Sequence, residues 1–561
     1  MNWYEGISKN NKTITLNSDE KYIFDFLKYL IGMIPSLSGL EMRVAGGWVR
    51  DKLLAQPSDD IDIALSFSKK SDRKITGEDF VRYIEKASQY VTDSPIIDTW
   101  FIAADESKAK NIAPAAIKLK APSGNIYKIE FVNLRTEEYD ENSRVPRADI
   151  TNDPSEDAQR RDLTINSLFY NIGDKNIEDY VGGVEDLKNM RIKTPLDPKK
   201  TFIDDPLRML RVLRFYSKYP NAKLDKSILD ALSDNNVQSS YDKLSPERSS
   251  VELLKMLKGD RAVDASKILF ETGLYRKVFK IPEDYLDIDM DQKTPYHNLT
   301  LLNHTLKVMN GLDNISKRED IPNDERAYLL LSGMMHDFGK MSREIQQPHP
   351  KDPSRMRYIG HDRASADFAK DILTQMGFAP EVKSFVDAVI RNHMFLHQFK
   401  DGKIKEKSIG KFLSKVGDYY KYIIHHGEAD SLGRDIDSDD DVSRIVNQYT
   451  DFRNQINNYK TEMSQPDQNM ISNPLLDGNE IDNIVQQYAP ELIKNKAFIN
   501  IKDKKVFYIK YLINKLLEAQ WSREVSNRDQ AENFIQSAVK NLLNLWKSQS
   551  KKGIYNENKL V

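Results

Sequence analysis

The stretch RVAGGWVRDKLLAQPSDDIDIAL, from Arg43 to Leu65, decides the fold of this 561-residue chain. Its apolar runs flank the pair Gly46-Gly47 and predict a strand, a turn, a helix and a second strand. Side chains alternate between the two faces of a strand, so Asp60 and Asp62 point to one face while the isoleucines beside them point to the core. Like charges on one face repel unless a cation neutralises them. The stretch therefore predicts a site for a divalent metal ion and a phosphate.

The composition limits the class of protein. A chain of this length holds three or more packed domains at about 100 to 200 residues each. Its 83 basic and 85 acidic residues nearly cancel, so any nucleic-acid contact must come from local patches. The absence of cysteine excludes disulfides and thiolate zinc sites and leaves His, Asp and Glu as metal ligands. No apolar run reaches about 18 residues and the start lacks a signal-peptide pattern, so we expect a cytoplasmic protein without a membrane segment.

A third carboxylate is predicted further along the head. Alternating apolar residues over Ile126–Leu134 predict a strand in which Glu130 points away from the core, where it could join the aspartates. The charged segment from Arg135 to Asp157 predicts a long loop, and loops of this length are often functional. The segment Asp157–Tyr170, DAQRRDLTINSLFY, predicts a helix with an arginine-rich start.

A row of charged side chains marks the next predicted helix, Thr201–Tyr219. Asp205 and Arg208 stand one turn apart on one face, and Arg211 and Arg214 continue the row. An ordinary intrahelical ion pair, worth about 0.3 to 0.5 kcal/mol, is the alternative interpretation. From here to the end the periodicity is almost wholly helical. The predicted fold class is therefore α+β, with a small mixed-sheet head followed by a long all-α body.

A second chemical region lies within the helical body. His304 and the adjacent pair His336-Asp337 occupy apolar helical contexts, where neighbouring imidazole and carboxylate groups can reach one cation. Asp430 is available as a fourth ligand. Such a ligand set suits magnesium or a transition metal, which could activate a water molecule. The remaining histidines indicate that not every histidine here needs a role; they include His349, His397, His425 and His426.

The last hundred residues mix lysines with aromatic residues, as in Lys504-Lys505 and Phe507-Tyr508. This pattern predicts a surface for an RNA backbone, and a solvated helix face is an equally good interpretation of the sequence.

Four ordered motifs, GGWVRDKLL, DDIDIA, RRDLTIN and DDPLR, resemble those of class II tRNA nucleotidyltransferases, the CCA-adding enzymes. These enzymes share a polymerase-β-type head with bacterial poly(A) polymerases. The resemblance implies that Asp60 and Asp62 bind two magnesium ions that polarise the α-phosphate and activate the primer 3′-hydroxyl, with Glu130 as a third catalytic carboxylate. The nucleotide-binding residues that it implies are Gly46, Gly47, Arg50, Asp51, Arg161, Asp162, Asn166, Asp205, Arg208, Arg211 and Arg214.

The same resemblance assigns base selection to the protein itself. Asp205 and Arg208 would pair with the Watson–Crick edge of incoming CTP or ATP. A carboxylate acceptor and a guanidinium donor one turn apart can match the edges of C and A and leave G or U mispaired. The loop from Arg135 to Asp157 occupies the place of the family's flexible loop, which governs the switch to adding A.

The histidine region resembles the HD phosphohydrolase domain attached to many bacterial members of the family. Four residues match its metal-ligand positions: His304, His336, Asp337 and Asp430. His361 and His393 match two further histidines of binuclear versions. The resemblance implies a divalent metal (Mg, Mn, Ni, Co or Fe) and leaves the substrate open among a 2′,3′-cyclic phosphate, a 2′-nucleotide and a terminal phosphate.

These inferences predict four parts: a nucleotidyltransferase head at 1–170, a neck and base-recognition part at 171–285, an HD domain at 286–450 and a helical tRNA-binding tail at 451–561. We expect template-independent addition or repair of the 3′-terminal CCA of tRNA from CTP and ATP, with an HD domain that hydrolyses phosphates at tRNA 3′ ends. The alternatives are a poly(A) polymerase, a CC-only or A-only enzyme and, from another class, an HD phosphohydrolase with an RNA-binding head.

Overall fold

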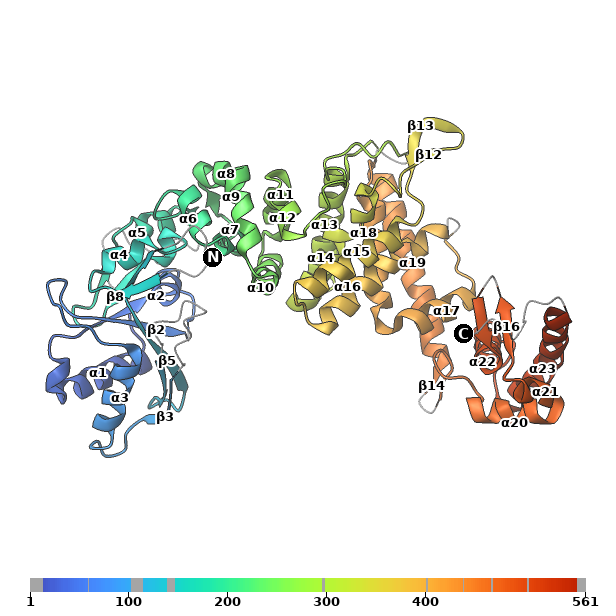
Figure 1. Cartoon of the computed structure of the whole chain (residues 1–561), viewed down its shortest axis with the longest axis horizontal. Helices are drawn as coiled ribbons and strands as arrows, with labels where there is room; N and C mark the ends of the chain where they lie inside the picture. Colours follow the sequence, from blue (N-terminus) through green and yellow to red (C-terminus); the bar gives the residue numbers. More distant parts are fainter. Residues whose placement is uncertain are drawn as a thin grey trace. The chain divides into compact units, whose positions relative to one another are not determined.

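The computed structural model describes residues 14–58, 60–101, 115–138, 147–294, 298–399, 402–436, 438–465, 468–501 and 504–551. It divides the chain into two compact units (Figure 1). The first unit comprises Met1–Tyr285 with Ile372–Phe378, and the second comprises Leu286–Asp371 with Ala379–Val561.

A mixed sheet forms the head of the first unit. Its elements are α1 (Ser18–Gly32), β1 (Glu41–Ala45), α2 (Gly47–Leu53), β2 (Ile61–Ser66), α3 (Gly77–Ser88), β3 (Ile96–Phe101), β4 (Ala115–Lys120), β5 (Ile126–Asn133), β8 (Phe169–Asn171) and β9 (Asn176–Glu178). The described strands lie in the order β3-β4-β5-β2-β1-β8-β9, with β2 parallel to β5 and the other neighbours antiparallel. Helices α1 and α3 lie on one face of this sheet (Figure 1), and their apolar side chains pack in one core with Ile61, Ile63, Ile129 and Phe131. The opposite face of β2 and β5 is thereby left for their carboxylates.

The predicted strand-turn-helix-strand unit is confirmed as β1, α2 and β2, and the strand predicted around Glu130 is confirmed as β5. Helix α1 begins with a capping box. Asn17 is the cap, because its side chain accepts a hydrogen bond from Glu20 N (2.8 Å) and Glu20 Oε2 accepts one from Asn17 N (2.9 Å).

Two local predictions in the head are wrong. The segment after Leu134 is not simply a loop, because β6 (Arg135–Glu138) pairs antiparallel with β7 (Arg147–Ile150). The predicted helix Asp157–Tyr170 is replaced by the end of α4 (Pro154–Gln159), a 3₁₀ turn η3 (Thr164–Asn166) and the start of β8. Asp162 accounts for this break, since its carboxylate accepts hydrogen bonds from Leu163 N and Asn166 Nδ2 and so competes with helical bonding.

Short helices complete the first unit. They and their connecting elements are η1 (Pro35–Leu37), α5 (Gly183–Lys188), β10 (Arg191–Ile192), α6 (Pro198–Asp204), α7 (Leu207–Lys218), β11 (Lys223–Leu224), α8 (Lys226–Leu232), α9 (Asn235–Ser239), η4 (Ser240–Lys243), α10 (Pro246–Leu257), α11 (Ala262–Glu271) and α12 (Tyr275–Val278). The single helix predicted over Thr201–Tyr219 is split between α6 and α7. Asp205 takes extended angles (φ −136°, ψ 98°) because the proline that follows it disfavours the helical conformation.

The second unit is mostly helical. Its elements are α13 (Leu301–Arg318), α14 (Asn323–Met335), η5 (Phe338–Met341), β12 (Gln347–His349), β13 (Asp352–Arg357), α15 (His361–Gln375), α16 (Pro380–Asn392), η6 (His393–Gln398), α17 (Glu406–Val416), η7 (Gly417–Tyr419), α18 (Tyr420–Leu432), α19 (Asp439–Met463), β14 (Ser464–Gln465), β15 (Gln468–Asn469), α20 (Gly478–Tyr488), α21 (Pro490–Lys494), β16 (Phe498–Ile501), β17 (Lys504–Phe507), α22 (Tyr508–Trp521) and α23 (Arg528–Lys551). Helix α15 ends in the short segment that belongs to the first unit. The hairpins β12–β13, β14–β15 and β16–β17 interrupt the predicted all-helical body.

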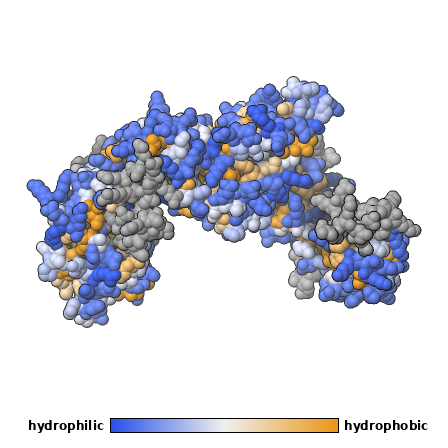
Figure 2. Space-filling model, in the orientation of Figure 1, coloured by the Kyte–Doolittle hydropathy of each residue, from blue (hydrophilic) through white to orange (hydrophobic). Residues whose placement is uncertain are grey.

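The tail of the second unit has an apolar core of its own, built mainly by α20, α22 and α23. In contrast to that core, hydrophilic residues cover most of the described surface on the face drawn in Figure 2. Among the described helices, none combines the length and the apolar character needed to cross a bilayer.

Candidate functional site

The predicted catalytic carboxylates lie on adjacent strands of the head. Asp62 on β2 is the direct neighbour of Glu130 on β5, because the two parallel strands pair in this register. Asp60 precedes β2 by one residue and is exposed. The buried isoleucine on either side of Asp62 points into the core beneath α1 and α3. The alternation read from the sequence thus brings three carboxylates to one face of the sheet.

These carboxylates fit a divalent cation electrostatically. Burial, followed by the charges of Asp60 and Glu130, raises the pKa of Asp62 to about 6. The positive charge on Arg161 opposes this rise, and Lys128 forms an ion pair with Glu130. A bound cation would relieve the repulsion that raises this pKa, so oxygen ligands of this kind suit magnesium.

The glycine turn lies beside a chain of hydrogen bonds. Gly46 has φ +68°, and a Cβ atom there would lie 2.9 Å from Arg161 Nη1, so only glycine fits without displacing that guanidinium. Arg50 is clamped by both carboxylate oxygens of Asp51 at 2.8 and 2.9 Å and also donates to Asn166 Oδ1. Gly47 opens α2, where backbone N–H groups can face a phosphate. Asp51, which the resemblance places among the nucleotide-binding residues, thus fixes the side chain of Arg50.

The third motif links this turn to helix α7. Asn166 Nδ2 donates to Asp162 Oδ1 (3.1 Å), and Asp162 Oδ2 pairs with Arg211 Nη2 (2.5 Å). Burial alone would raise the pKa of Asp162, but the charge of Arg211 and further contacts hold it below its ordinary value. Arg161 Nη1 donates to the backbone carbonyl of Asn166 (3.1 Å). The motifs that lie far apart in the sequence therefore form one connected polar network.

The predicted base-reading pair is held by separate partners. Arg208 is buried and donates to the carbonyl oxygen of Arg160 (2.6 Å). Asp205 lies at the break before α7, within 3.8 Å of Arg248. Sequence reasoning missed Glu137 on β6. Its Oε2 atom lies 3.6 Å from Arg208 Nη2.

Sequence reasoning also missed a carboxylate that lies beside two of the arginines of α7. Glu252 on α10 lies 3.1 Å from Arg214 Nη1 and 3.9 Å from Arg211 Nη1. Glu137 sits among several other carboxylates, and Glu252 lies in an ordinary apolar helix pattern, so no local signal singles either of them out.

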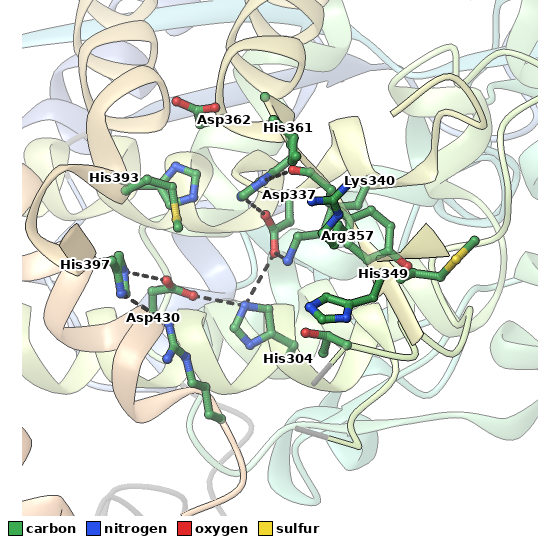
Figure 3. A pocket seen from close by; sticks show the side chains of 17 residues that line it. His304, Asp337, Lys340, His349, Arg357, His361, Asp362, His393, His397 and Asp430 are labelled. Carbon is green, nitrogen blue, oxygen red and sulfur yellow. Dashed lines mark hydrogen bonds and ion pairs between the residues drawn. The ribbon is translucent and has the colours of Figure 1, made fainter. Parts of the chain in front are cut away.

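The second cluster lies in a pocket of about 500 Å³ in the second unit (Figure 3). His304 Nε2 lies 3.4 Å from Asp337 Oδ2, 3.0 Å from Asp430 Oδ1 and 3.4 Å from His336 Nε2. His336 Nε2 lies 3.2 Å from Asp337 Oδ2 and 4.0 Å from Asp430 Oδ1. The four residues predicted as ligands therefore converge on one point.

A second group of possible ligands shares Asp337. The ligand atoms of Asp337, His361 and His393 all lie within 4.8 Å of one another, and His361 Nε2 is 3.3 Å from Asp337 Oδ1. The carboxylate of Asp337 thus lies between both groups of histidines.

The histidine rings are oriented as metal ligands are. In four of them the Nδ1 atom lies 2.7 to 3.1 Å from a backbone carbonyl oxygen, to which an N–H there would donate, so that the Nε2 lone pair can serve a metal ion. They are His304, His336, His361 and His393. Both oxygens of Asp337 are buried and accept no well-aligned hydrogen bond among the described residues. Oxygens in this position fit a divalent cation, because imidazole and carboxylate are common ligands.

For two ligands of the pocket, neighbouring charges oppose the effect of burial on the pKa. Burial alone would lower the pKa of His304, but Asp337 and Asp430 outweigh it and raise that pKa to about 9. Burial also acts to raise the pKa of Asp430, and the neighbouring His397 and His304 hold it well below its usual value. His393 has the opposite shift, because burial and adjacent histidines lower its pKa. The pocket therefore keeps its carboxylates ionised.

Two histidines that the sequence analysis left without a role lie at this pocket. His397 Nε2 is 2.8 Å from Asp430 Oδ2, and His349 lines the wall. A spacing of four residues between His393 and His397 was the available signal. Lys340 Nζ, from the motif HDFGK, lies 2.6 Å from Asp337 Oδ2.

Comparisons with known proteins match both parts of the chain that carry these clusters. Residues 42–193 match the family described as the poly(A) polymerase head domain, residues 223–286 match a probable RNA and SrmB-binding site of polymerase A, and residues 301–468 match the HD domain. A mitochondrial CCA tRNA nucleotidyltransferase of Candida glabrata is 27% identical over 507 residues, 84% of this chain and 90% of that protein. A tRNA nucleotidyltransferase of Schizosaccharomyces pombe is 38% identical over 277 residues, 47% of this chain and only 54% of that protein.

The fold is also shared with solved structures. The CCA-adding enzyme of Bacillus stearothermophilus in complex with CTP gives a TM-score of 0.55 at 16% identity, over 94% of this chain and 100% of that one. The chain is thus a nucleotidyltransferase with a poly(A) polymerase head and an attached HD domain. Within this class, the relatives that it matches are named as CCA tRNA nucleotidyltransferases or tRNA nucleotidyltransferases. The resemblance to CCA-adding enzymes and the α+β fold class predicted from the sequence are confirmed.

Proposed function

We propose that the head adds the 3′-terminal CCA to tRNA from CTP and ATP without a nucleic-acid template. The observation that carries this proposal is the pairing of Asp62 with Glu130 beside a polar network that reaches the row of arginines on α7. Catalytic carboxylates and a base-reading helix in one connected site suit nucleotide addition better than simple RNA binding.

In the proposed reaction the 3′-hydroxyl oxygen of tRNA attacks the α-phosphorus of the nucleotide. A new P–O bond forms, the bond to the β-phosphate breaks, pyrophosphate leaves, and the hydroxyl proton passes to solvent. Asp60, Asp62 and Glu130 would hold magnesium, which supplies charge stabilisation at the reacting phosphate when bound. The Gly46-Gly47 turn and Arg50 would hold the triphosphate in line with the primer.

Extension of a shortened tRNA tests this proposal. We expect tRNA lacking its last three residues to gain C, C and A when incubated with CTP, ATP and magnesium, as read by sequencing of the 3′ ends. A long A tail would indicate a poly(A) polymerase instead, and addition of only CC or only A would indicate a partial enzyme. No extension at all would favour an HD phosphohydrolase with an RNA-binding head.

Base selection would depend on Asp205 and Arg208. Replacing Arg208 by alanine should lower the preference for CTP and ATP over UTP and GTP by about 10- to 100-fold, because one good bidentate contact discriminates by about 1 to 3 kcal/mol. The measurement is the ratio of kcat/KM values for the four nucleotides. Arg261→Ala is the matched control, since Arg261 also donates to a backbone carbonyl, that of Ala222, but lies outside the predicted site. Unchanged selectivity in Arg208→Ala would refute the protein template.

For the second unit we propose a metal-dependent phosphohydrolase that acts on phosphates at tRNA 3′ ends. Water attacks phosphorus, the ester P–O bond breaks, and the leaving oxygen takes a proton. His304, His336, Asp337 and Asp430 would hold a divalent ion, which supplies an activated water when bound. The metals to compare are Mg, Mn, Ni, Co and Fe, and the substrates are a 2′,3′-cyclic phosphate, a 2′-nucleotide and a terminal phosphate.

Cytoplasmic location stays a prediction, and the relative from Candida glabrata is named as mitochondrial.

A further inference from the structure

The pocket in the second unit has a charge balance that favours an anion. Its lining contains three carboxylates, of Asp337, Asp362 and Asp430, and three permanent cations. The cations are Lys340, Arg357 and Arg434. These charges cancel, so each divalent metal ion held by the histidines and aspartates would leave an excess of two positive charges. A phosphate group is the common ligand that restores neutrality at such a site.

Two of the three cations already have anionic or polar partners within the pocket. Lys340 Nζ lies 2.6 Å from Asp337 Oδ2, and Arg434 Nη2 donates to His397 Nδ1 at 3.1 Å. Arg357 differs from them. Among the described residues its buried Nε atom has no hydrogen-bond partner, and no carboxylate lies within ion-pair distance of its guanidinium. A buried guanidinium nitrogen without a partner is costly unless a ligand occupies it.

The backbone beside Arg357 is held in place. Residue 357 ends strand β13, and the backbone N–H of Met356 donates to the carbonyl of Lys293 at 2.9 Å. The hydroxyl of Tyr358 donates to the carbonyl of Gln292 at 2.7 Å. In Figure 3, Arg357 lies next to Lys340 on the side of the pocket that carries His349. The guanidinium is therefore presented from fixed neighbours rather than from a free loop.

We propose that Arg357 binds the phosphate group of the molecule that the HD pocket takes. A guanidinium can form two parallel hydrogen bonds to phosphate oxygens, and its charge survives at every physiological pH. The substrate class is a phosphate ester, as a free nucleotide or at an RNA 3′ end. This inference rests on the proposed hydrolase function for its substrate, but phosphate binding itself can be measured without turnover.

The test compares Arg357→Gln and Arg357→Lys with Arg355→Gln in the full-length protein. Arg355 is the matched control, because it lies two residues away on the same strand and pairs with Asp352 outside the pocket lining. Binding of inorganic phosphate to the Mn²⁺-loaded protein is measured by calorimetry, and Mn²⁺ binding is measured separately. We expect Arg357→Gln to weaken phosphate binding by about 10- to 100-fold, the usual effect of a lost hydrogen bond to a charged group. Arg357→Lys should lose less, and Arg355→Gln should change binding less than about twofold.

The same variants are assayed for hydrolysis of 2′-adenylate and of tRNA that ends in a 3′ phosphate. A raised KM on either substrate supports the inference and identifies the source of the phosphate. If the wild type hydrolyses neither but binds phosphate through Arg357, the hydrolase proposal fails and the role of Arg357 stands. Phosphate binding that is absent in the wild type, or unchanged in Arg357→Gln with Mn²⁺ binding intact, would overturn the inference.

Discussion

Replacing Asp62 by asparagine should abolish nucleotide addition while leaving the head folded and able to bind tRNA. Asparagine keeps the shape of the side chain but removes the charge that would hold magnesium. Metal-assisted stabilisation of a reacting phosphate is worth several kcal/mol, and about 1.4 kcal/mol corresponds to a tenfold change in rate. We therefore expect a loss of about a thousandfold or more in kcat for CTP addition, measured with saturating tRNA and magnesium.

The stability of this variant should move in the opposite direction to its activity. The pKa of Asp62 is raised from 3.8 to about 6 by burial and by its neighbouring carboxylates, so its ionised form opposes folding above that pH. Without magnesium at about pH 7.5, Asp62→Asn should match or exceed the melting temperature of the wild type. This difference should shrink as the pH falls through about 6 towards 4, where Asp62 becomes protonated in the folded protein.

Two further variants separate the metal site from general effects on the sheet. Asp98→Asn changes an exposed carboxylate on strand β3 and should leave addition unchanged within about twofold. Glu130→Gln tests the third carboxylate, which lies beside Asp62 in register. Addition that survives in Asp62→Asn at the rate of Asp98→Asn would remove the metal assignment.

The head shows which inferences a sequence supports well. Alternation with a period of two is a local property, so the common face of Asp62 and Glu130 could be predicted from the sequence alone. The register that makes them neighbours depends on a parallel pairing between segments more than 60 residues apart, and the sequence offers no measure of it. A residue that precedes proline disfavours the helical conformation, so the break at Asp205-Pro206 could have been predicted. It was missed because the apolar periodicity across it favours one continuous helix.

Other features depend on side-chain hydrogen bonds or tertiary contacts that leave no periodic pattern in the sequence. Asp162 turns the chain by accepting bonds from its own neighbours, although DAQRRDLTINSLFY reads as a helix by composition. The contact of Glu137 with Arg208 joins strands and helices that no motif connects. His397 illustrates the same limit in the second unit, because only the fold shows that its ring reaches Asp430.

Replacing His336 by alanine should remove phosphohydrolysis and spare nucleotide addition. His336 Nε2 lies 3.2 Å from Asp337 Oδ2 and 3.4 Å from His304 Nε2, so its loss takes one ligand from the point where the others converge. Removal of a ligand should lower the rate of hydrolysis by about 100-fold or more, and it should also lower the affinity for the metal ion. Addition should stay within about twofold, because the carboxylates and the arginines of α7 belong to the first unit.

The control for this prediction must lose a buried histidine without losing a ligand. His425→Ala is suitable, since His425 is buried on the same helix as Asp430 but contacts Arg453 and does not line the pocket. Asp430→Asn provides a second ligand change with little loss of volume. If His336→Ala lost hydrolysis through misfolding, His425→Ala would lose it too, whereas Asp430→Asn would keep it. Loss of hydrolysis in His336→Ala and Asp430→Asn alone, with CCA addition intact in all three, is the pattern that two chemically separate sites require.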